Sequence, residues 1–211
     1  MEKLLAENIF NLGAELEQVV RQPKGALRPV ELRVGNADAV PKLVVTRLLE
    51  PAMSQAQPFK VISREGKLDS LLAELAVHRL DLVLSDIPLP PALSVTAFNH
   101  RLGGASVGFY ASTALAERAK GAFPACLDGL PLLAPGADSA MGVRLTQWLG
   151  KHKLRPQVVG EFDDGALVTE LGKQGHGVFV APMVLDQEVR SQYGVRLLGE
   201  ATDLIEEFYV I

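Results

Sequence analysis

The sequence predicts an α/β protein made of two lobes with a cleft between them, preceded by a single helix. Three observations predict this fold class. Short apolar runs alternate with amphipathic segments, a turn-rich stretch at residues 87–94 interrupts the series, and the first 22 residues carry apolar side chains at heptad spacing. The length of 211 residues is ample for a buried core.

The leading segment, residues 1–22, is predicted to be a linker and dimerisation helix. Its apolar residues are spaced by four, three, four and three, which is typical of a coiled-coil seam: Leu5, Ile9, Leu12, Leu16 and Val19. The alternative is an amphipathic helix that packs on its own domain. Residues 23–29 contain proline and glycine and are predicted to be a linker.

The first lobe is predicted to comprise residues 30–96 and 198–211. Apolar runs predict strands over residues 31–36, 59–63 and 81–86, and leucines at helical spacing predict a helix over residues 67–77. Asp38 is predicted to cap the other helix, which accepts Pro41 in its first turn and ends near Glu50. This alternation predicts parallel strands with helical crossovers.

The second lobe is predicted to comprise residues 97–197. The same reasoning predicts strands over residues 103–112, 131–135, 157–162 and 177–182, and helices over residues 113–120, 139–152 and 165–173. Two further strands, over residues 195–199 and 206–211, are predicted to close the chain. We expect the chain to cross between lobes near residues 88–104 and to return near residues 195–205.

Ligands of open α/β sheets bind beyond the carboxyl ends of the strands. The strand ends and helix starts therefore predict an effector site lined from the first lobe by Asn36, Asp38, Ser63, Glu65, Ser85 and Asp86. The second lobe is predicted to contribute Gly136, Ser139, Phe162, Asp163, Asp164, Ala181 and Pro182.

Composition excludes several classes of protein. No apolar stretch is long enough to span a membrane, and the N-terminus lacks the basic start of a signal peptide, so we expect a cytoplasmic protein. A net charge of −4 argues against nucleic-acid binding by this chain alone. Cys126 is the single cysteine, which rules out an intramolecular disulfide, and it is predicted to be a packed residue.

No catalytic or cofactor motif is present, so we expect neither an enzyme nor a cofactor. Trp148 is predicted to pack in the core. The four histidines lack metal-ligand spacing and are predicted to be structural: His78, His100, His152 and His176.

The ordered series of motifs resembles the effector-binding domain of LysR-type transcription regulators. The first lobe carries Leu71, Leu72 and Leu75 followed by RLDLVLSD, and the second carries AFPACLDGLPLLAPG, VVGEFDDGALV and GVFVAP, which are similar to the NhaR branch of that family. The resemblance implies two Rossmann-like lobes of the type 2 periplasmic-binding-protein plan. It also implies an activator that responds to Na⁺ or Li⁺, assembles as a homodimer or tetramer, and binds DNA through a winged helix-turn-helix that we expect to be absent here, making this chain a fragment.

The predicted site is rich in carboxylates, which would repel an organic anion and suit a hard cation. We therefore expect Na⁺ or Li⁺ at Asp38, Asp86 and Asp163. The alternative is that these aspartates cap helices and turns. Two other functions stay open: a LysR-type regulator that responds to a small organic ligand, and a stand-alone solute-binding protein of periplasmic type. An enzyme that uses cleft carboxylates would need a partnered general base, which the sequence does not indicate.

Overall fold

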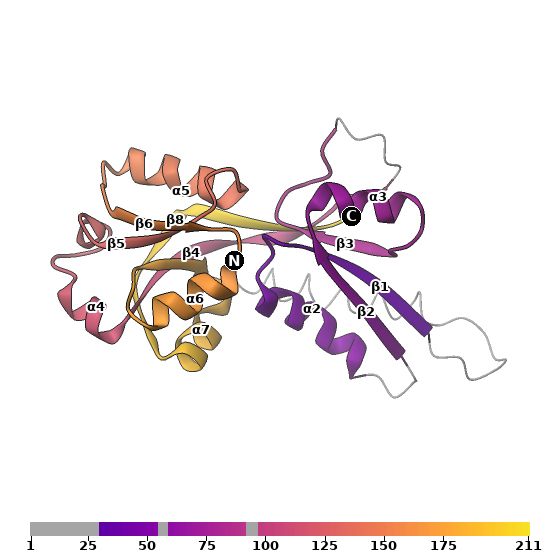
Figure 1. Cartoon of the computed structure of the whole chain (residues 1–211), viewed down its shortest axis with the longest axis horizontal. Helices are drawn as coiled ribbons and strands as arrows, with labels where there is room; N and C mark the ends of the chain where they lie inside the picture. Colours follow the sequence, from indigo (N-terminus) through magenta and orange to yellow (C-terminus); the bar gives the residue numbers. More distant parts are fainter. Residues whose placement is uncertain (1–29, 55–58, 92–96) are drawn as a thin grey trace. The chain divides into compact units, whose positions relative to one another are not determined.

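The computed structural model describes residues 30–54, 59–91 and 97–211 (Figure 1). The predicted dimerisation residues Leu5, Ile9, Leu12, Leu16 and Val19 lie outside the described residues. The elements follow in this order: β1 (Val30–Ala37), α2 (Lys42–Met53), β2 (Phe59–Gly66), α3 (Leu68–Ala76), β3 (Leu82–Ser85), β4 (His100–Ser112), α4 (Thr113–Arg118), η1 (Ala125–Leu127), β5 (Pro131–Pro135), α5 (Ala140–Lys151), β6 (Gln157–Phe162), α6 (Gly165–Lys173), β7 (Phe179–Pro182), η2 (Met183–Leu185), α7 (Asp186–Tyr193) and β8 (Val195–Val210).

The chain divides into two compact units. Unit 1 extends up to Gly103 and includes Glu207–Ile211, and unit 2 is Gly104–Glu206. The chain therefore passes into unit 2 within β4 and returns to unit 1 within β8. The predicted lobe boundaries at residues 97 and 198 stay a prediction.

Unit 1 is built on parallel strands. β1 lies between β2 and β3 and is parallel to both, while the end of β8 runs antiparallel to β3, with Leu84 opposite Val210. Helices α2 and α3 lie on opposite faces of these strands (Figure 1). A Cβ on Gly35 would lie 3.2 Å from Leu71 Cδ2, so α3 covers the face to which position 35 points. Leu32 and Val34 alternate with Gly35 and therefore face α2.

Helix α2 corrects a predicted cap. Pro41, not Asp38, precedes its first residue, and no side chain caps it. The residue before a proline is disfavoured in the helical conformation, so the helix cannot begin before Pro41. Asp38 is too far from the first turn to cap it, and its backbone N–H instead donates to Gly66 O at 3.1 Å. The helix also continues past the predicted end, through Pro51 to Met53.

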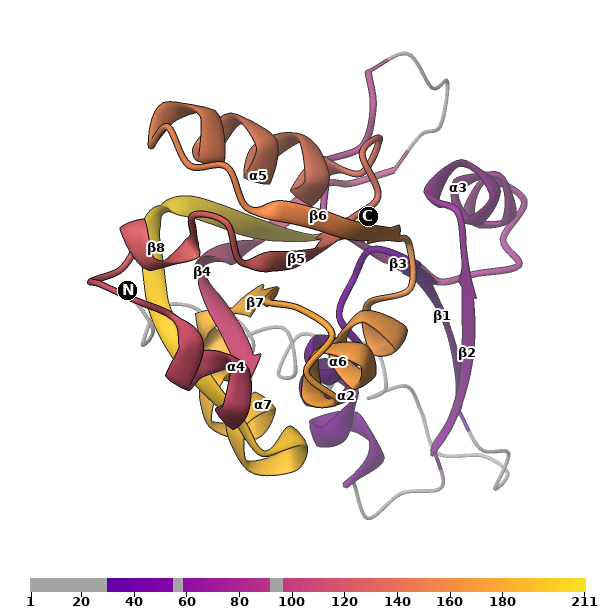
Figure 2. The same cartoon turned by 60° about the vertical axis from the view of Figure 1, so that its left-hand side comes forward.

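Unit 2 contains both parallel and antiparallel strand pairs. β7 runs antiparallel to β4, and β5 and β6 form a parallel pair that a parallel bridge from Leu132 to Val178 connects to the start of β7. Figure 2 shows α5 on one side of these strands and α6 and α7 on the other. The sheets are therefore mixed, with the hydrogen-bonding order β2-β1-β3-β8-β4-β7 and a separate β5-β6 pair.

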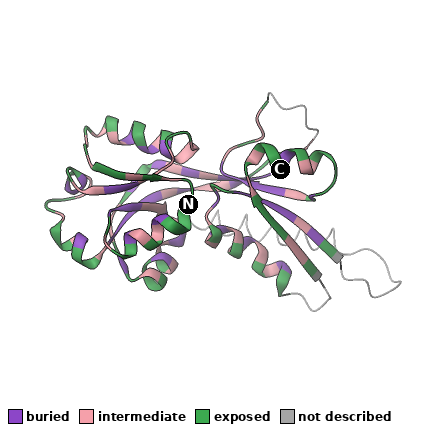
Figure 3. Ribbon diagram, in the orientation of Figure 1, coloured by how far each residue is buried: buried purple, intermediate pink, exposed green. Residues whose placement is uncertain are grey.

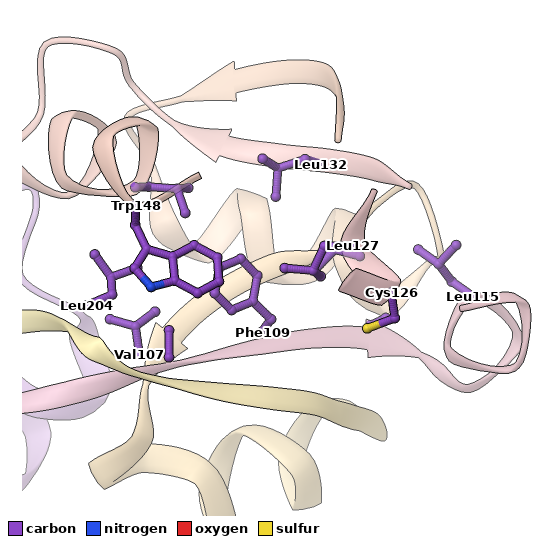
Figure 4. Packing of buried hydrophobic residues seen from close by; sticks show 12 residues of the cluster. Val107, Phe109, Leu115, Cys126, Leu127, Leu132, Trp148 and Leu204 are labelled. Carbon is purple, nitrogen blue, oxygen red and sulfur yellow. The ribbon is translucent and has the colours of Figure 1, made fainter. Parts of the chain in front are cut away.

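A cluster of buried hydrophobic residues forms the core of unit 2 (Figure 4). The Trp148 ring of α5 lies 5.2 Å from the Phe109 ring of β4 and 6.0 Å from the Phe123 ring, as measured between centroids. Cys126 belongs to the same buried cluster. Both Trp148 and Cys126 are thus packing residues, as the sequence indicates. Figure 3 shows buried residues along β1, β3 and β4, whereas β2 and β6 are largely exposed, and it shows that the helices expose their outer faces.

Two features of unit 2 differ from the prediction. β8 is one strand of 16 residues rather than two, because Ala201 and Leu204 in its middle are buried and continue the sheet. Helix α7 was not predicted, since Val189 is its single buried residue and its other positions are largely polar. A usable signal exists: acidic residues occupy its first turn, and Gly194 ends it in the left-handed region with φ 65°.

Candidate functional site

Five of the six site residues predicted in the first lobe lie at the carboxyl ends of β1, β2 and β3 in unit 1; Ser63 lies three residues before the end of β2, opposite Val34, because β2 continues past its predicted end to Gly66. We call all six the unit 1 strand-end cluster: Asn36, Asp38, Ser63, Glu65, Ser85 and Asp86. Asn36 pairs in register with Glu65 on one side and Leu84 on the other, so Ser85 and Asp86 follow at the level of Ala37 and Asp38. Parallel pairing thus brings together residues that are up to 50 positions apart.

Asn36 and Ser63 form a partly buried polar contact in this cluster, in which Asn36 is buried and Ser63 is exposed. Asn36 is 6% exposed, and its Nδ2 donates to Ser63 Oγ at 2.6 Å. Asn36 Oδ1 is buried and has no hydrogen-bond partner among the described residues. Buried polar atoms are nearly always paired, so this oxygen requires an explanation.

Lys42 is a member of the site that sequence reasoning missed. It is the first residue of α2, and its Nζ lies 2.6 Å from Glu65 Oε1, with both side chains more than half exposed. The ion pair cancels much of the charge of Glu65 at the cluster. Its position directly after Pro41 was the available signal, because a proline before a helix marks the start of the helix.

The remaining members of the unit 1 strand-end cluster differ in burial. Ser85 is fully buried, and its Oγ accepts a hydrogen bond from Ile87 N at 3.1 Å, which stabilises the turn after β3. Asp86 is also buried, whereas Asp38 is exposed. Three members of the cluster are therefore buried and three are exposed: the buried ones are Asn36, Ser85 and Asp86, and the exposed ones are Asp38, Ser63 and Glu65.

The site residues predicted in the second lobe gather in unit 2 at the ends of three strands. We call them the unit 2 strand-end cluster: Gly136, Ser139, Phe162, Asp163, Asp164, Ala181 and Pro182. Pro135 pairs in register with Phe162, and Gly136 N donates to Phe162 O at 2.9 Å. β7 runs parallel to β5 from the Leu132 bridge, which places its last residues, Ala181 and Pro182, at the same edge.

Two helices begin at this edge, and both are capped. Ser139 Oγ accepts from Gly142 N at 3.0 Å at the start of α5. Asp164 Oδ1 accepts from Ala166 N at 2.8 Å and from Leu167 N at 3.3 Å at the start of α6. Asp164 is therefore the N-cap of α6. Asp163, which the sequence analysis left open as a helix or turn cap, is not the N-cap of this helix, and its side chain lies against Gly136.

The three aspartates proposed to bind a cation are divided between the units. Asp38 and Asp86 follow neighbouring strands of unit 1, and Asp163 belongs to unit 2. Within residues 30–54, 59–91 and 97–211, no group of three histidine, cysteine or acidic side chains is arranged to hold a metal ion. A cation bound at either cluster by itself would draw on hydroxyl, amide and backbone oxygens as well as carboxylates.

Outside the two clusters, the carboxyl group of Asp203 in β8 has a lowered pKa. Lys151 Nζ donates to its Oδ2 at 2.5 Å and Trp148 Nε1 to its Oδ1 at 2.6 Å, and these bonds hold the pKa of Asp203 well below its usual range. His152 lies 3.3 Å from the same carboxylate and against the Trp148 ring. These contacts connect the end of α5 to β8, and His152 takes part in them through Asp203 and Trp148. Burial raises the pKa of the Cys126 thiol, which disfavours a reactive thiolate.

Comparison with known proteins agrees with this architecture. Residues 27–211 match the family model described as LysR substrate binding domain. The transcriptional activator protein NhaR of Escherichia coli (strain K12) is 31% identical over 206 residues, which cover 98% of this chain and 67% of that protein.

Solved structures agree on the fold. The regulatory domain of HypT from Salmonella typhimurium superposes with a TM-score of 0.64 at 17% identity, covering 89% of this chain and 87% of that one. The reduced regulatory domain of OxyR2 from Vibrio vulnificus gives 0.65 at 13% identity, covering 90% and 89%. The predicted fold class, an α/β protein of the type 2 periplasmic-binding-protein plan, is confirmed. No helix in the described part of the chain combines the length and apolarity needed to cross a membrane. This chain belongs to the LysR substrate-binding domain family and is the effector-sensing domain of a LysR-type transcription regulator.

Proposed function

We propose that this chain serves an NhaR-like transcription activator and that its effector is Na⁺ or Li⁺, bound at a strand-end cluster. The observation that carries the proposal is the 31% identity to NhaR over 98% of the chain. The chemistry of the unit 1 strand-end cluster supports it, since amide, hydroxyl and carboxylate oxygens are the ligands that hard cations prefer.

The effector would act by binding one arrangement of the regulator more tightly than another. Only such unequal affinity allows a ligand to shift a conformational equilibrium. We further propose that residues 1–22 join the chain into a homodimer or tetramer, that a separate winged helix-turn-helix domain contacts DNA, and that the protein works in the cytoplasm without catalysing a reaction.

A small organic ligand is the second candidate effector. Lys42 favours it, because its ammonium group lies beside the unit 1 strand-end cluster and would attract an organic anion once released from Glu65. An anionic effector would compete with Glu65 for Lys42, whereas a cation would leave this ion pair intact.

Thermal unfolding in matched salts tests the cation proposal. The chain is melted in NaCl, LiCl, KCl and choline chloride at equal ionic strength. A ligand at ten times its Kd adds about 1.4 kcal/mol of stability, which raises the Tm of a chain of this size by about 3–6 °C. If neither Na⁺ nor Li⁺ raises the Tm beyond the choline control, the cation proposal fails. Sedimentation tests oligomerisation separately, and a monomer at high concentration would contradict it.

A further inference from the structure

We propose that Tyr110 is a positioning residue, whose hydroxyl group fixes the turn between β7 and α7 and so sets the position of Ala181 and Pro182 in the unit 2 strand-end cluster. The inference rests on the proposed function, because it treats this cluster as part of the effector site, but it assigns no ligand contact to Tyr110. Tyr110 is fully buried in β4. Burying a hydroxyl group costs free energy unless a hydrogen bond satisfies it, so the partner of this group identifies its role.

The Tyr110 side chain reaches this turn by passing over Gly108. The two residues are two positions apart in β4 and therefore share one face of the strand. Tyr110 lies opposite Phe179 of β7, whereas Gly108 lies opposite Ala181, nearer the carboxyl end of β7. A Cβ on Gly108 would lie 2.8 Å from both the Tyr110 hydroxyl oxygen and Met183 Sδ. The glycine thus leaves the room in which the phenol extends along β4 to the end of β7.

The hydroxyl group of Tyr110 contacts two residues of the turn. It donates a hydrogen bond to Asp186 Oδ1 at 3.2 Å, and it lies 3.6 Å from Met183 Sδ. A hydroxyl carries a single hydrogen, and an ionised carboxylate accepts it more strongly than a thioether, so the hydrogen is directed to Asp186 while Met183 packs beside it. Burial raises the pKa of Tyr110 well above its usual range, and the carboxylate of Asp186 raises it further. The phenol therefore remains a hydrogen-bond donor at neutral pH.

Asp186 connects this contact to the backbone of the turn. It is the first residue of α7, and its backbone N–H donates to Met183 O, which closes the short helix η2 directly after Pro182. Its other carboxylate oxygen, Oδ2, lies 2.9 Å from Arg190 Nη2 one turn along α7. A side chain of β4 thus holds both the residue that follows β7 and the residue that begins α7.

Removal of the hydroxyl group alone tests the assignment. Tyr110→Phe keeps the ring, whose centroid lies 5.7 Å from that of Phe179, and deletes the donor. Tyr193→Phe is the matched control, because it deletes the same group from the last residue of α7. Two NMR readouts in choline chloride report on the turn: the hydrogen-exchange rate of the Asp186 amide and the amide chemical shift of Ala181. Neither readout requires an effector.

We expect Tyr110→Phe to accelerate exchange of the Asp186 amide at least tenfold and to shift the Ala181 signal, while amides of β5 and β6 keep their native rates. Tyr193→Phe should leave all of these signals unchanged. Asp186→Ala should reproduce the effect of Tyr110→Phe, and Asp186→Asn, which keeps an acceptor oxygen, should show a smaller one. Because the two residues act through one hydrogen bond, Tyr110→Phe combined with Asp186→Ala should exchange no faster than the more affected single variant.

The assignment is overturned if Tyr110→Phe leaves the Asp186 exchange rate or the Ala181 signal unchanged. It is also overturned if exchange in β5 and β6 accelerates equally, since that would report a general loss of stability.

Melting in NaCl and LiCl then separates this inference from the proposed function. If either salt raises the native Tm beyond the choline control, Tyr110→Phe should weaken the apparent affinity several-fold and Tyr193→Phe should not; a full native response in Tyr110→Phe overturns the assignment while the cation proposal stands. If neither salt acts on the native chain, the cation proposal fails, and the Asp186 and Ala181 signals decide the role of Tyr110.

Discussion

Substitutions of Asp164 and of its neighbour Asp163 should distinguish the effect of losing a helix cap from the effect of losing an ion ligand. Asp164 Oδ1 accepts hydrogen bonds from Ala166 N at 2.8 Å and from Leu167 N at 3.3 Å at the start of α6. Asp163 is not the N-cap of this helix. Asp164→Ala removes both bonds and the charge that favours a helix start, while Asp164→Asn keeps a capping oxygen and loses the charge alone. We also propose Asp163 as a cation ligand, so Asp163→Asn should affect the response to ions.

The magnitudes follow from these contacts. Loss of an N-cap costs about 1 kcal/mol, and loss of a negative charge at an exposed helix start costs about 0.3–1 kcal/mol more. At about 2–4 °C per kcal/mol for a chain of this length, Asp164→Ala should lower the Tm by about 3–8 °C and Asp164→Asn by about 1–4 °C. Asp163→Asn should change stability by less than about 0.5 kcal/mol, the ordinary range for a surface substitution.

The assay is thermal unfolding followed by circular dichroism, in choline chloride and in NaCl or LiCl at equal ionic strength. Asp164→Ala should lose stability and keep the ion response, and Asp163→Asn should keep stability and lose part of the ion response. The capping account is refuted if Asp164→Asn is as destabilised as Asp164→Ala, since asparagine caps as well as aspartate. It is equally refuted if Asp163→Asn destabilises the chain as much as Asp164→Ala.

Further predictions concern packing and pH. Gly172→Ala should destabilise unit 2 by about 1–3 kcal/mol, because the added Cβ would meet the buried Phe179 ring. Gly150→Ala, which meets no atom within 4 Å, should instead stabilise by about 0.5–1 kcal/mol, and chemical denaturation measures both. Asp203 has a pKa lowered chiefly by Lys151, so its stabilisation is present above the ordinary value of 3.8 and is lost as pH falls further. Asp203→Asn should therefore destabilise the chain at pH 7 and flatten the fall in Tm below pH 4; an unchanged acid profile would contradict this.

Local signals in the sequence were sufficient for most individual elements. The helix predicted at residues 165–173 has the bounds of α6; in the structure Asp164 caps its start and Gly175 follows its end. The strands over residues 131–135 and 157–162 likewise match β5 and β6, because short apolar runs are bounded by turn residues. Where a local signal was ambiguous the prediction was wrong: Asp38 satisfies the composition of a cap, but Pro41 decides where α2 begins.

The sequence by itself determined the alternation of strands and helices, and with it the two groups of residues at the strand ends, because hydrophobic periodicity and helix starts are properties of neighbouring residues. The tertiary structure decided which oxygens in those groups are buried and which charges are paired. Asn36 faces Ser63, and Glu65 meets Lys42, only because β1 and β2 pair in a particular register and α2 begins beside them. Contacts between residues more than 20 positions apart depend on strand register and helix packing, which no local pattern specifies.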